Sequence, residues 1–173
     1  MNAGATDIVI RALVKDDAAQ WRRLRLEALQ TYPTAFASSY EEALNQDLAA
    51  RIPPEGPDAL FGAFHNDLLS GSAGLYVQTL LKQRHKGQLW GVYVDPSLHR
   101  HGVGAALVRA VIAHARSHVA VLQLSVQLEN LAARALYRRL GFVAYGIERR
   151  ALRYQGRDYD DELMALDLIA RDT

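Results

Sequence analysis

The chain has 173 residues, half of them apolar, which suits one compact domain with a proper core. Its 20 Lys and Arg balance 19 Asp and Glu, so the overall charge favours neither a nucleic acid nor an acidic partner. It contains no cysteine, which excludes a disulfide framework, a thiolate zinc site and a cysteine nucleophile.

The first half of the chain predicts a strand, two helices and further strands. Residues 8–11 are a short β-type run, and the helix that follows ends at Tyr32-Pro33. Ser39 and Glu42 have the spacing of a capping box, which predicts a second helix running towards Ala50. The next strands are expected over residues 60–65, 69–80 and 89–94.

A glycine-rich segment, His99-Arg100-His101-Gly102-Val103-Gly104, lies between the strand 89–94 and a helix. Such a turn presents bare backbone N–H groups at the positive end of a helix, an arrangement that binds phosphate. The same glycines are also compatible with nothing more than a tight strand-to-helix turn. The elements expected after this helix are a strand over 121–126, a helix over 131–140 ended by Gly141, and strands over 142–148 and 163–168.

Two common phosphate-binding motifs do not match this segment. A Walker loop needs Lys and Ser or Thr after its last glycine, where this chain has Ala105 and Ala106. A dinucleotide fingerprint needs a third small residue where this chain has Leu107. The amide of Asn130 and the phenol of Tyr137 follow at helical spacing, which favours a site for a phosphorylated cofactor with a reactive end.

The order of elements predicts a mixed α/β fold with a partly antiparallel sheet. Residues 89–126 form a strand-helix-strand unit, so its two strands should lie parallel. We expect 1–173 to be a single domain. No apolar run approaches the ~20 residues of a membrane span, and residues 1–7 have no signal-peptide character, so we also expect a cytoplasmic protein.

Two segments together resemble the GCN5-related N-acetyltransferases. Residues 92–104 are similar to the acetyl-CoA signature of that family, and residues 126–142 are similar to its second signature. The resemblance covers roughly residues 8–168. It implies a central, mostly antiparallel twisted sheet of about seven strands, with a parallel, splayed central pair and about four flanking helices. The family loop usually begins with Gln or Arg where this chain has His99.

The resemblance implies transfer of an acetyl group from acetyl-CoA to a primary amine, of a small molecule or a peptide, by direct attack in a ternary complex. An alternative is an acyl-CoA-binding regulatory domain with little transferase activity. A transferase for a longer acyl chain also stays open. A homodimer is possible, whereas no membrane or nucleic-acid partner is expected. The histidine pairs of the chain lack the carboxylate or cysteine that would complete a metal site, so no metal is expected.

The cofactor would place its pyrophosphate on the N–H groups of Arg100 to Ala105 and its pantetheine arm along the backbone of Val92 to Val94. Asn130 is expected to bond the pantetheine arm, to cap its own helix, or both. The residues implied in cofactor binding are Val92, Tyr93, Val94, His99, Arg100, His101, Gly102, Val103, Gly104, Ala105, Asn130, Ala133, Tyr137 and Arg139.

Tyr137 is the implied catalytic residue, which would supply a proton to the departing thiolate; the alternative is a core aromatic residue at helical spacing. The strand 89–94 has no carboxylate, so the general base stays unassigned, with His85, Glu41, Glu42 and Asp160 as candidates. The residues expected to shape the acceptor site are Phe36, Ser39, Tyr40, Arg153 and Asp160.

Overall fold

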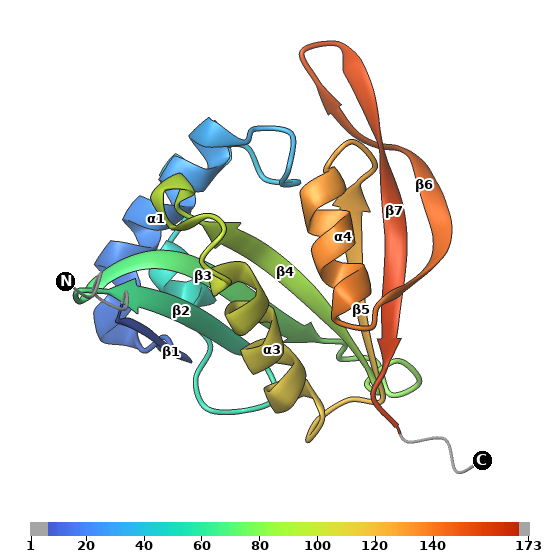
Figure 1. Cartoon of the computed structure of the whole chain (residues 1–173), viewed down its shortest axis with the longest axis horizontal. Helices are drawn as coiled ribbons and strands as arrows, with labels where there is room; N and C mark the ends of the chain where they lie inside the picture. Colours follow the sequence, from blue (N-terminus) through green and yellow to red (C-terminus); the bar gives the residue numbers. More distant parts are fainter. Residues whose placement is uncertain (1–6, 170–173) are drawn as a thin grey trace, which may run out of the picture.

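The computed structural model describes residues 7–169 and has a seven-stranded mixed sheet in the order β1-β2-β3-β4-β5-β7-β6 (Figure 1). The segment 1–6, on which most of the signal-peptide expectation rests, lies outside the described residues. The strands are β1 (Ile8–Ala12), β2 (Ala59–His65), β3 (Leu68–Val77), β4 (Lys86–Val94), β5 (Val121–Gln127), β6 (Val143–Tyr154) and β7 (Arg157–Asp167). The α-helices are α1 (Ala18–Thr31), α2 (Tyr40–Leu44), α3 (Val103–Ala115) and α4 (Leu131–Arg139).

Every strand pairing is antiparallel except that of β4 with β5. The expected parallel pair and mixed sheet are therefore confirmed. Within residues 7–169, no helix is long and apolar enough to cross a bilayer.

Two cores lie on opposite faces of the sheet. Alternate residues of a strand point to opposite faces, so Ala63 on β2 packs in the core that contains α3, whereas Leu60 and Phe64 pack in the core that contains α1. The α3 core extends to α4 through Tyr137 and includes Phe142. Both faces of the central strands are thus covered by packed side chains. This packing holds in place the strand ends that form the site.

The parallel ladder between β4 and β5 is short. It joins Lys86 to Val121, Gly87 to Leu122 and Gln88 to Gln123. Both strands continue beyond these pairs, and Figure 1 shows them diverging. We call the region beyond the last pair, residues 89–94 of β4 and 124–127 of β5, the β4–β5 opening.

A bulge in β4 lies beside this opening. Tyr93 pairs with Ser72 and Trp90 with Gly74, so two residues of β4 face one residue of β3. Gly91 has φ +63°, the left-handed conformation that glycine adopts at low cost. The Ser72 hydroxyl donates to the Gly91 carbonyl oxygen at 3.1 Å and holds the bulge in place.

Several expected boundaries are wrong. The second helix does not reach Ala50, because Asp47 caps a separate 3₁₀ turn (Leu48–Arg51) by accepting from the N–H groups of that turn. β3 ends at Val77 because the chain turns at Leu80, where the carbonyl accepts from Gln83 N. The last two strands are longer than predicted and form one hairpin around Gln155 and Gly156, both with positive φ.

Candidate active site

The β4 backbone has one unpaired edge in the β4–β5 opening. β3 occupies the other edge, where Asp95 N donates to Ser70 O. Because successive residues of a strand point to alternate edges, the N–H and C=O of Val94 face the opening. His99 supports this orientation, since its Nε2 lies 2.9 Å from Val94 O. Val94, one of the predicted residues, therefore presents its backbone N–H to an extended, amide-like ligand.

The Tyr93 side chain points away from this opening. It is buried in the α1 core, and its hydroxyl donates to Glu27 Oε1 at 2.9 Å. Burial, followed by the hydrogen bond to Glu27, raises the pKa of Tyr93. By the same alternation its N–H and C=O face β3, where Tyr93 pairs with Ser72, so neither its side chain nor its backbone is turned towards the opening.

The glycine-rich segment forms a loop that leads into α3. Arg100 has φ +65° and Gly102 has φ +75°, so the chain makes two left-handed steps before the helix. Ala106 N donates to Gly102 O, the first helical hydrogen bond. The N–H groups ahead of it, from Val103 to Ala105, have no helical partner and point to the helix N-terminus. The loop thus has the donors that a phosphate needs.

Both histidines of this loop contact backbone carbonyl groups nearby. His99 contacts the end of β4, and His101 Nδ1 lies 2.9 Å from His99 O. A Cβ added at Gly102 would meet no protein atom within 4 Å, so the space beside the loop is open. Arg100 supplies a positive charge to this loop. Its side chain has no partner among the described residues.

Helix α4 and its N-cap contribute four of the predicted residues, Asn130, Ala133, Tyr137 and Arg139. Asn130 caps the helix, with its side-chain oxygen accepting from Ala133 N at 3.1 Å, so the predicted capping role is observed. Ala133 packs against the α3 core. Arg139 is exposed and has no side-chain partner among residues 7–169. It remains available to a phosphate.

Glu162 on β7 anchors α4 to the sheet. Arg134 and Arg138 both donate to its buried carboxylate, at distances from 2.8 to 3.2 Å. The hydrogen bond from Arg134 is the main cause that holds the pKa of Glu162 below its usual range. Arg138 is thereby occupied, which distinguishes it from its neighbour Arg139.

Tyr137 projects from α4 into the α3 core, where its ring packs edge-on against Phe142 at 5.8 Å. The residue is only 7% exposed, and burial raises the pKa of its phenol to about 12. Its hydroxyl makes no hydrogen bond within residues 7–169, yet no fully enclosed side-chain polar atom of these residues lacks a partner. The hydroxyl oxygen therefore keeps some access to solvent and is free to donate to a ligand.

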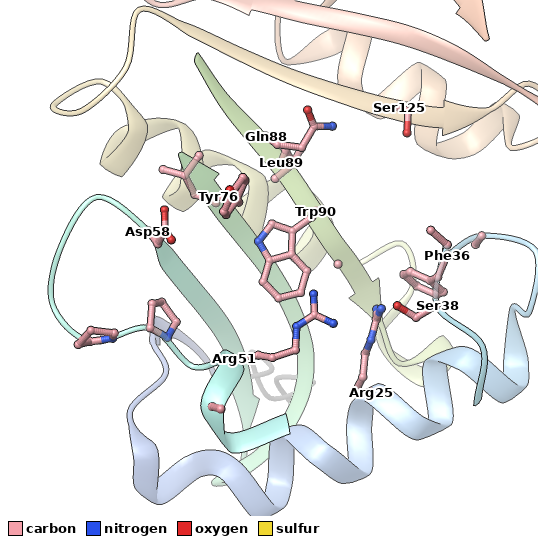
Figure 2. Close-up of a pocket in the computed structure, with 17 residues that line it drawn as sticks. Arg25, Phe36, Ser38, Arg51, Asp58, Tyr76, Gln88, Leu89, Trp90 and Ser125 are labelled. Carbon is pink, nitrogen blue, oxygen red and sulfur yellow. The ribbon is translucent and has the colours of Figure 1, made fainter. Parts of the chain in front are cut away.

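A cavity of about 630 Å³ opens at the β4–β5 opening and is shown in Figure 2. We call it the large cavity. β4 contributes residues 88–91 to its wall, and β5 contributes Ser125. The other walls come from the loop after α1, with Phe36, and from the turn that ends at Arg51. The Trp90 indole lies over Gly74, where a Cβ would come within 2.4 Å of the ring.

Two arginines enter the large cavity. Figure 2 shows Arg25 of α1 and Arg51 pointing from one side of it towards Trp90 and Phe36. Sequence reasoning missed Arg25, Arg51, Trp90 and Ser125 as site residues. They come from separate segments with no shared motif, so only the tertiary fold brings them together.

A smaller cavity of about 210 Å³ adjoins the large one, and the two share Phe36 and Ser125. Glu148 on β6 and Asp161 on β7 are paired residues that both line this small cavity. Burial raises the pKa of Asp161, and the negative charge of Glu148 adds to that shift. A carboxylate with a raised pKa beside a ligand cavity is a candidate proton acceptor.

The predicted acceptor residues occupy different places. Phe36 lines the large cavity and also a neighbouring cavity of about 440 Å³ between α2 and the β6–β7 hairpin, whose wall includes Ser39, Tyr40 and Arg153. Asp160 accepts from the side chain of Arg149 and from Arg150 N, so it stabilises the hairpin.

The four candidate bases lie outside the large cavity. The carboxylates that line the adjoining small cavity are those of Glu148 and of Asp161, which is one residue beyond the candidate Asp160. Among residues 7–169, no group of three His, Cys, Asp or Glu side chains is placed to hold a metal ion.

Comparison with known proteins gives a consistent set of relatives. The sequence profile of the acetyltransferase (GNAT) family matches residues 20–142. The N-alpha-acetyltransferase RimI of Mycobacterium tuberculosis is 30% identical over 161 residues, 91% of this chain and 92% of that protein. The mycothiol acetyltransferase of Mycolicibacterium gilvum is 32% identical over 126 residues, 67% of this chain and 41% of that protein.

Among solved structures, yncA from Salmonella typhimurium, determined with its cofactor acetyl-CoA, has a TM-score of 0.79 at 21% identity. The match covers 96% of this chain and 97% of that chain. At this identity the likeness concerns the fold.

Proposed function

Because the chain belongs to the acetyltransferase (GNAT) family, we propose that it transfers an acetyl group from acetyl-CoA to a primary amine by direct attack within a ternary complex. One observation carries this proposal. The Val94 N–H on the free edge of β4 faces the β4–β5 opening, the loop before α3 follows β4 along the chain, and the Tyr137 hydroxyl, on the helix that follows β5, has no protein partner within residues 7–169. This arrangement suits a long ligand with a phosphate at one end and a reactive group at the other.

The described residues fit acetyl-CoA chemically. N–H groups of the loop bind the pyrophosphate, and residues 99–105 include no carboxylate that would repel it. The edge of Val92 to Val94 pairs with the amides of the pantetheine arm. Arg139, which has no protein partner in the described chain, is the residue available to the 3′-phosphate. Acetyl-CoA supplies the acetyl thioester.

In this proposal, Tyr137 and Val94 stabilise the charge that develops during attack on that thioester. The Val94 N–H faces the β4–β5 opening and is the backbone donor for the developing oxyanion. The Tyr137 hydroxyl donates to the departing sulfur. Since the pKa of this phenol is about 12, the residue keeps its proton at neutral pH and acts as a donor.

Asp161 is the residue we propose to accept the proton of the acceptor amine. An alkyl ammonium has a pKa of about 10 and must lose a proton before it attacks. Asp161 lines the small cavity that adjoins the large cavity through Ser125, and burial raises its pKa towards that of a useful base. Glu148, opposite it, shares the negative charge that attracts the ammonium.

The names of the two relatives favour two different kinds of amine acceptor. One bears the name N-alpha-acetyltransferase, which favours an α-amine, and the other bears the name mycothiol acetyltransferase, which favours a small molecule. The large cavity, at about 630 Å³, lies in the range of small-molecule sites. The cytoplasmic location and the homodimer expected from the sequence stay predictions.

The test is the release of free CoA thiol from acetyl-CoA in the presence of a panel of α-amines and other primary amines. We expect amine-dependent release that falls about a hundredfold in Tyr137→Phe. Acetyl-CoA binding without release for any amine would instead favour the regulatory acyl-CoA-binding domain.

A further inference from the structure

Arg25 is a buried cation without a counter-charge. It is 8% exposed, and its guanidinium makes no hydrogen bond or ion pair with residues 7–169. Its guanidinium lies over the Phe36 ring, at 4.7 Å from the ring centroid. A buried charge is costly unless it is paired, so this arrangement stabilises the free protein poorly.

Several other arginines of the described chain are paired with carboxylates. Arg134 donates to Glu162 from beneath α4, and Arg11 donates through both terminal nitrogens to Asp17. Arg25 differs because its charged end faces the large cavity instead of a protein carboxylate (Figure 2). The fold therefore holds its charge in position for something that enters the cavity.

A second cation lies beside the first. Arg51 points into the same cavity, with its guanidinium 5.1 Å from the Trp90 ring centroid. Burial, and then the positive charge of Arg51, lowers the pKa of Arg25 to about 10, so Arg25 remains charged at neutral pH. Two converging guanidinium groups repel each other unless an anion lies between them.

The one carboxylate among the residues that line the large cavity does not serve these cations. Asp58 accepts from Val77 N at 2.8 Å and lies beside Tyr76, across Trp90 from Arg25 in Figure 2. The protein thus provides cations at one side of the cavity and leaves the anion to the ligand.

We propose that the acceptor amine carries a carboxylate, which Arg25 and Arg51 bind in the large cavity. This inference rests on the proposed transferase function and specifies its substrate class. The adjoining small cavity holds the opposite charge, since Asp161 and Glu148 line it. A substrate with its carboxylate at the arginines and its ammonium at Asp161 matches this arrangement, which is positive in the large cavity and negative in the small one.

The carboxylate has two possible sources, a free amino acid or an acidic side chain near the start of a peptide. Both present the same chemistry to Arg25, because guanidinium binds carboxylate in two parallel hydrogen bonds. The arms of the experiment separate these sources.

The experiment compares each L-amino acid with its carboxamide, and peptides that begin with Asp or Glu with those that begin with Asn or Gln. Rates are measured at saturating acetyl-CoA, and binding is measured as the shift in melting temperature of the CoA-loaded protein. We expect the acids to exceed their matched amides about tenfold or more in kcat/KM in one of the two arms. Arg25→Met should lower kcat/KM for the acids more than for the amides and so abolish that preference.

Arg84→Met is the matched control, because Arg84 is exposed in the β3–β4 loop and its side chain has no partner among the described residues. It should keep the full preference for acids. Arg25→Lys should restore part of the preference, since it returns the charge without the bidentate geometry. The melting temperature of unliganded Arg25→Met should equal or exceed that of the parent, because the lost charge was unpaired.

The outcomes separate this inference from the transferase function. Equal rates and equal melting shifts for acids and amides would overturn the inference even if amines are acetylated. A preference for acids in binding without any acetylation would support the anionic subsite and overturn the transferase function. A lower melting temperature in Arg25→Met with an unchanged acid preference would show that Arg25 only packs, and would also overturn the inference.

Discussion

Gln88 on β4 and Gln123 on β5 are the last partners of the parallel ladder at the centre of the sheet. Beyond them the two strands have no common hydrogen bonds, although each continues for several residues. The edge of β4 proposed for the cofactor and the large cavity proposed for the acceptor both begin at this point. Both halves of the candidate site, one for the cofactor and one for the acceptor, therefore begin where the β4–β5 ladder ends.

Replacing Gly102 tests the phosphate loop. Gly102 and Gly156 have φ +75° and +77°, and neither would bring a Cβ within 4 Å of a protein atom. Gly102→Ala and Gly156→Ala should therefore each lose about 1 kcal/mol of stability, the cost of a left-handed alanine. Only Gly102→Ala should also weaken acetyl-CoA binding, by about tenfold in Kd, measured by calorimetry. Equal affinities in the two variants would contradict the loop assignment.

Tyr137→Phe separates catalysis from folding. The Tyr137 hydroxyl has no partner in the described chain, so its loss should change the free energy of unfolding by less than about 0.5 kcal/mol while kcat falls about a hundredfold. Tyr93→Phe is the opposite case, because it removes the hydrogen bond to Glu27 and should cost about 1 kcal/mol. Its kcat should stay near that of the parent. A parent-like kcat in Tyr137→Phe would rule out the proton-donor role.

Asp161 should set the acidic limb of the pH profile of kcat. Its pKa is raised, chiefly by burial, so kcat should fall as the pH falls through that value and the carboxylate takes up a proton. Glu148→Gln removes the negative charge opposite Asp161 and should move the limb to lower pH. Asp161→Asn should abolish the limb and lower kcat about a hundredfold. If neither variant changes the acidic limb of the pH profile, a residue other than Asp161 is the base.

Asp161 should also lower the stability of the folded protein at neutral pH. A carboxyl whose pKa is raised in the folded protein disfavours folding when it is ionised, and this penalty disappears as the pH falls. Asp161→Asn should therefore raise the melting temperature at pH 7. The gain should vanish in acid, where the parent residue is already neutral.

Glu162 should make stability fall in acid. Its pKa is lowered, mainly by the hydrogen bond from Arg134, so its contribution is complete above the unfolded value of about 4.3 and is lost as the pH falls through the folded value. Glu162→Gln should cost about 3 kcal/mol at pH 7, and the difference from the parent should narrow below pH 4.

Glu129→Gln is the control for this effect. Glu129 pairs with Arg157 on the surface, so the substitution should cost less than about 1 kcal/mol. Chemical denaturation at several pH values measures both variants. A pH-independent difference between parent and Glu162→Gln would contradict the ion-pair account.

The sequence predicts the fold because its local signals agree with its tertiary packing. Ser39 and Glu42 form the predicted capping box, and Gly141 ends α4 with φ +97°. The length of the last hairpin could not be predicted, because its polar residues are held by ion pairs such as Arg149 with Asp160, which no hydrophobic periodicity signals.

The cofactor half of the candidate site is local in sequence, and the acceptor half is not. Residues 92–105 form one continuous motif, so the loop could be located from the sequence alone. Arg25, Arg51 and Ser125 lie on three different elements and meet only when the sheet has formed. No spacing rule links them, and an arginine on a helix such as α1 ordinarily indicates a solvated face.

The most direct test of the central claim is acetyl-CoA binding by the parent protein, measured as thermal unfolding with acetyl-CoA and with adenosine as the control. A ligand at a hundred times its Kd adds about 2.7 kcal/mol to stability, which corresponds to several degrees in melting temperature. We expect that rise with acetyl-CoA and none with adenosine. No rise at millimolar acetyl-CoA would mean that the β4–β5 opening does not hold the cofactor, and would contradict the account.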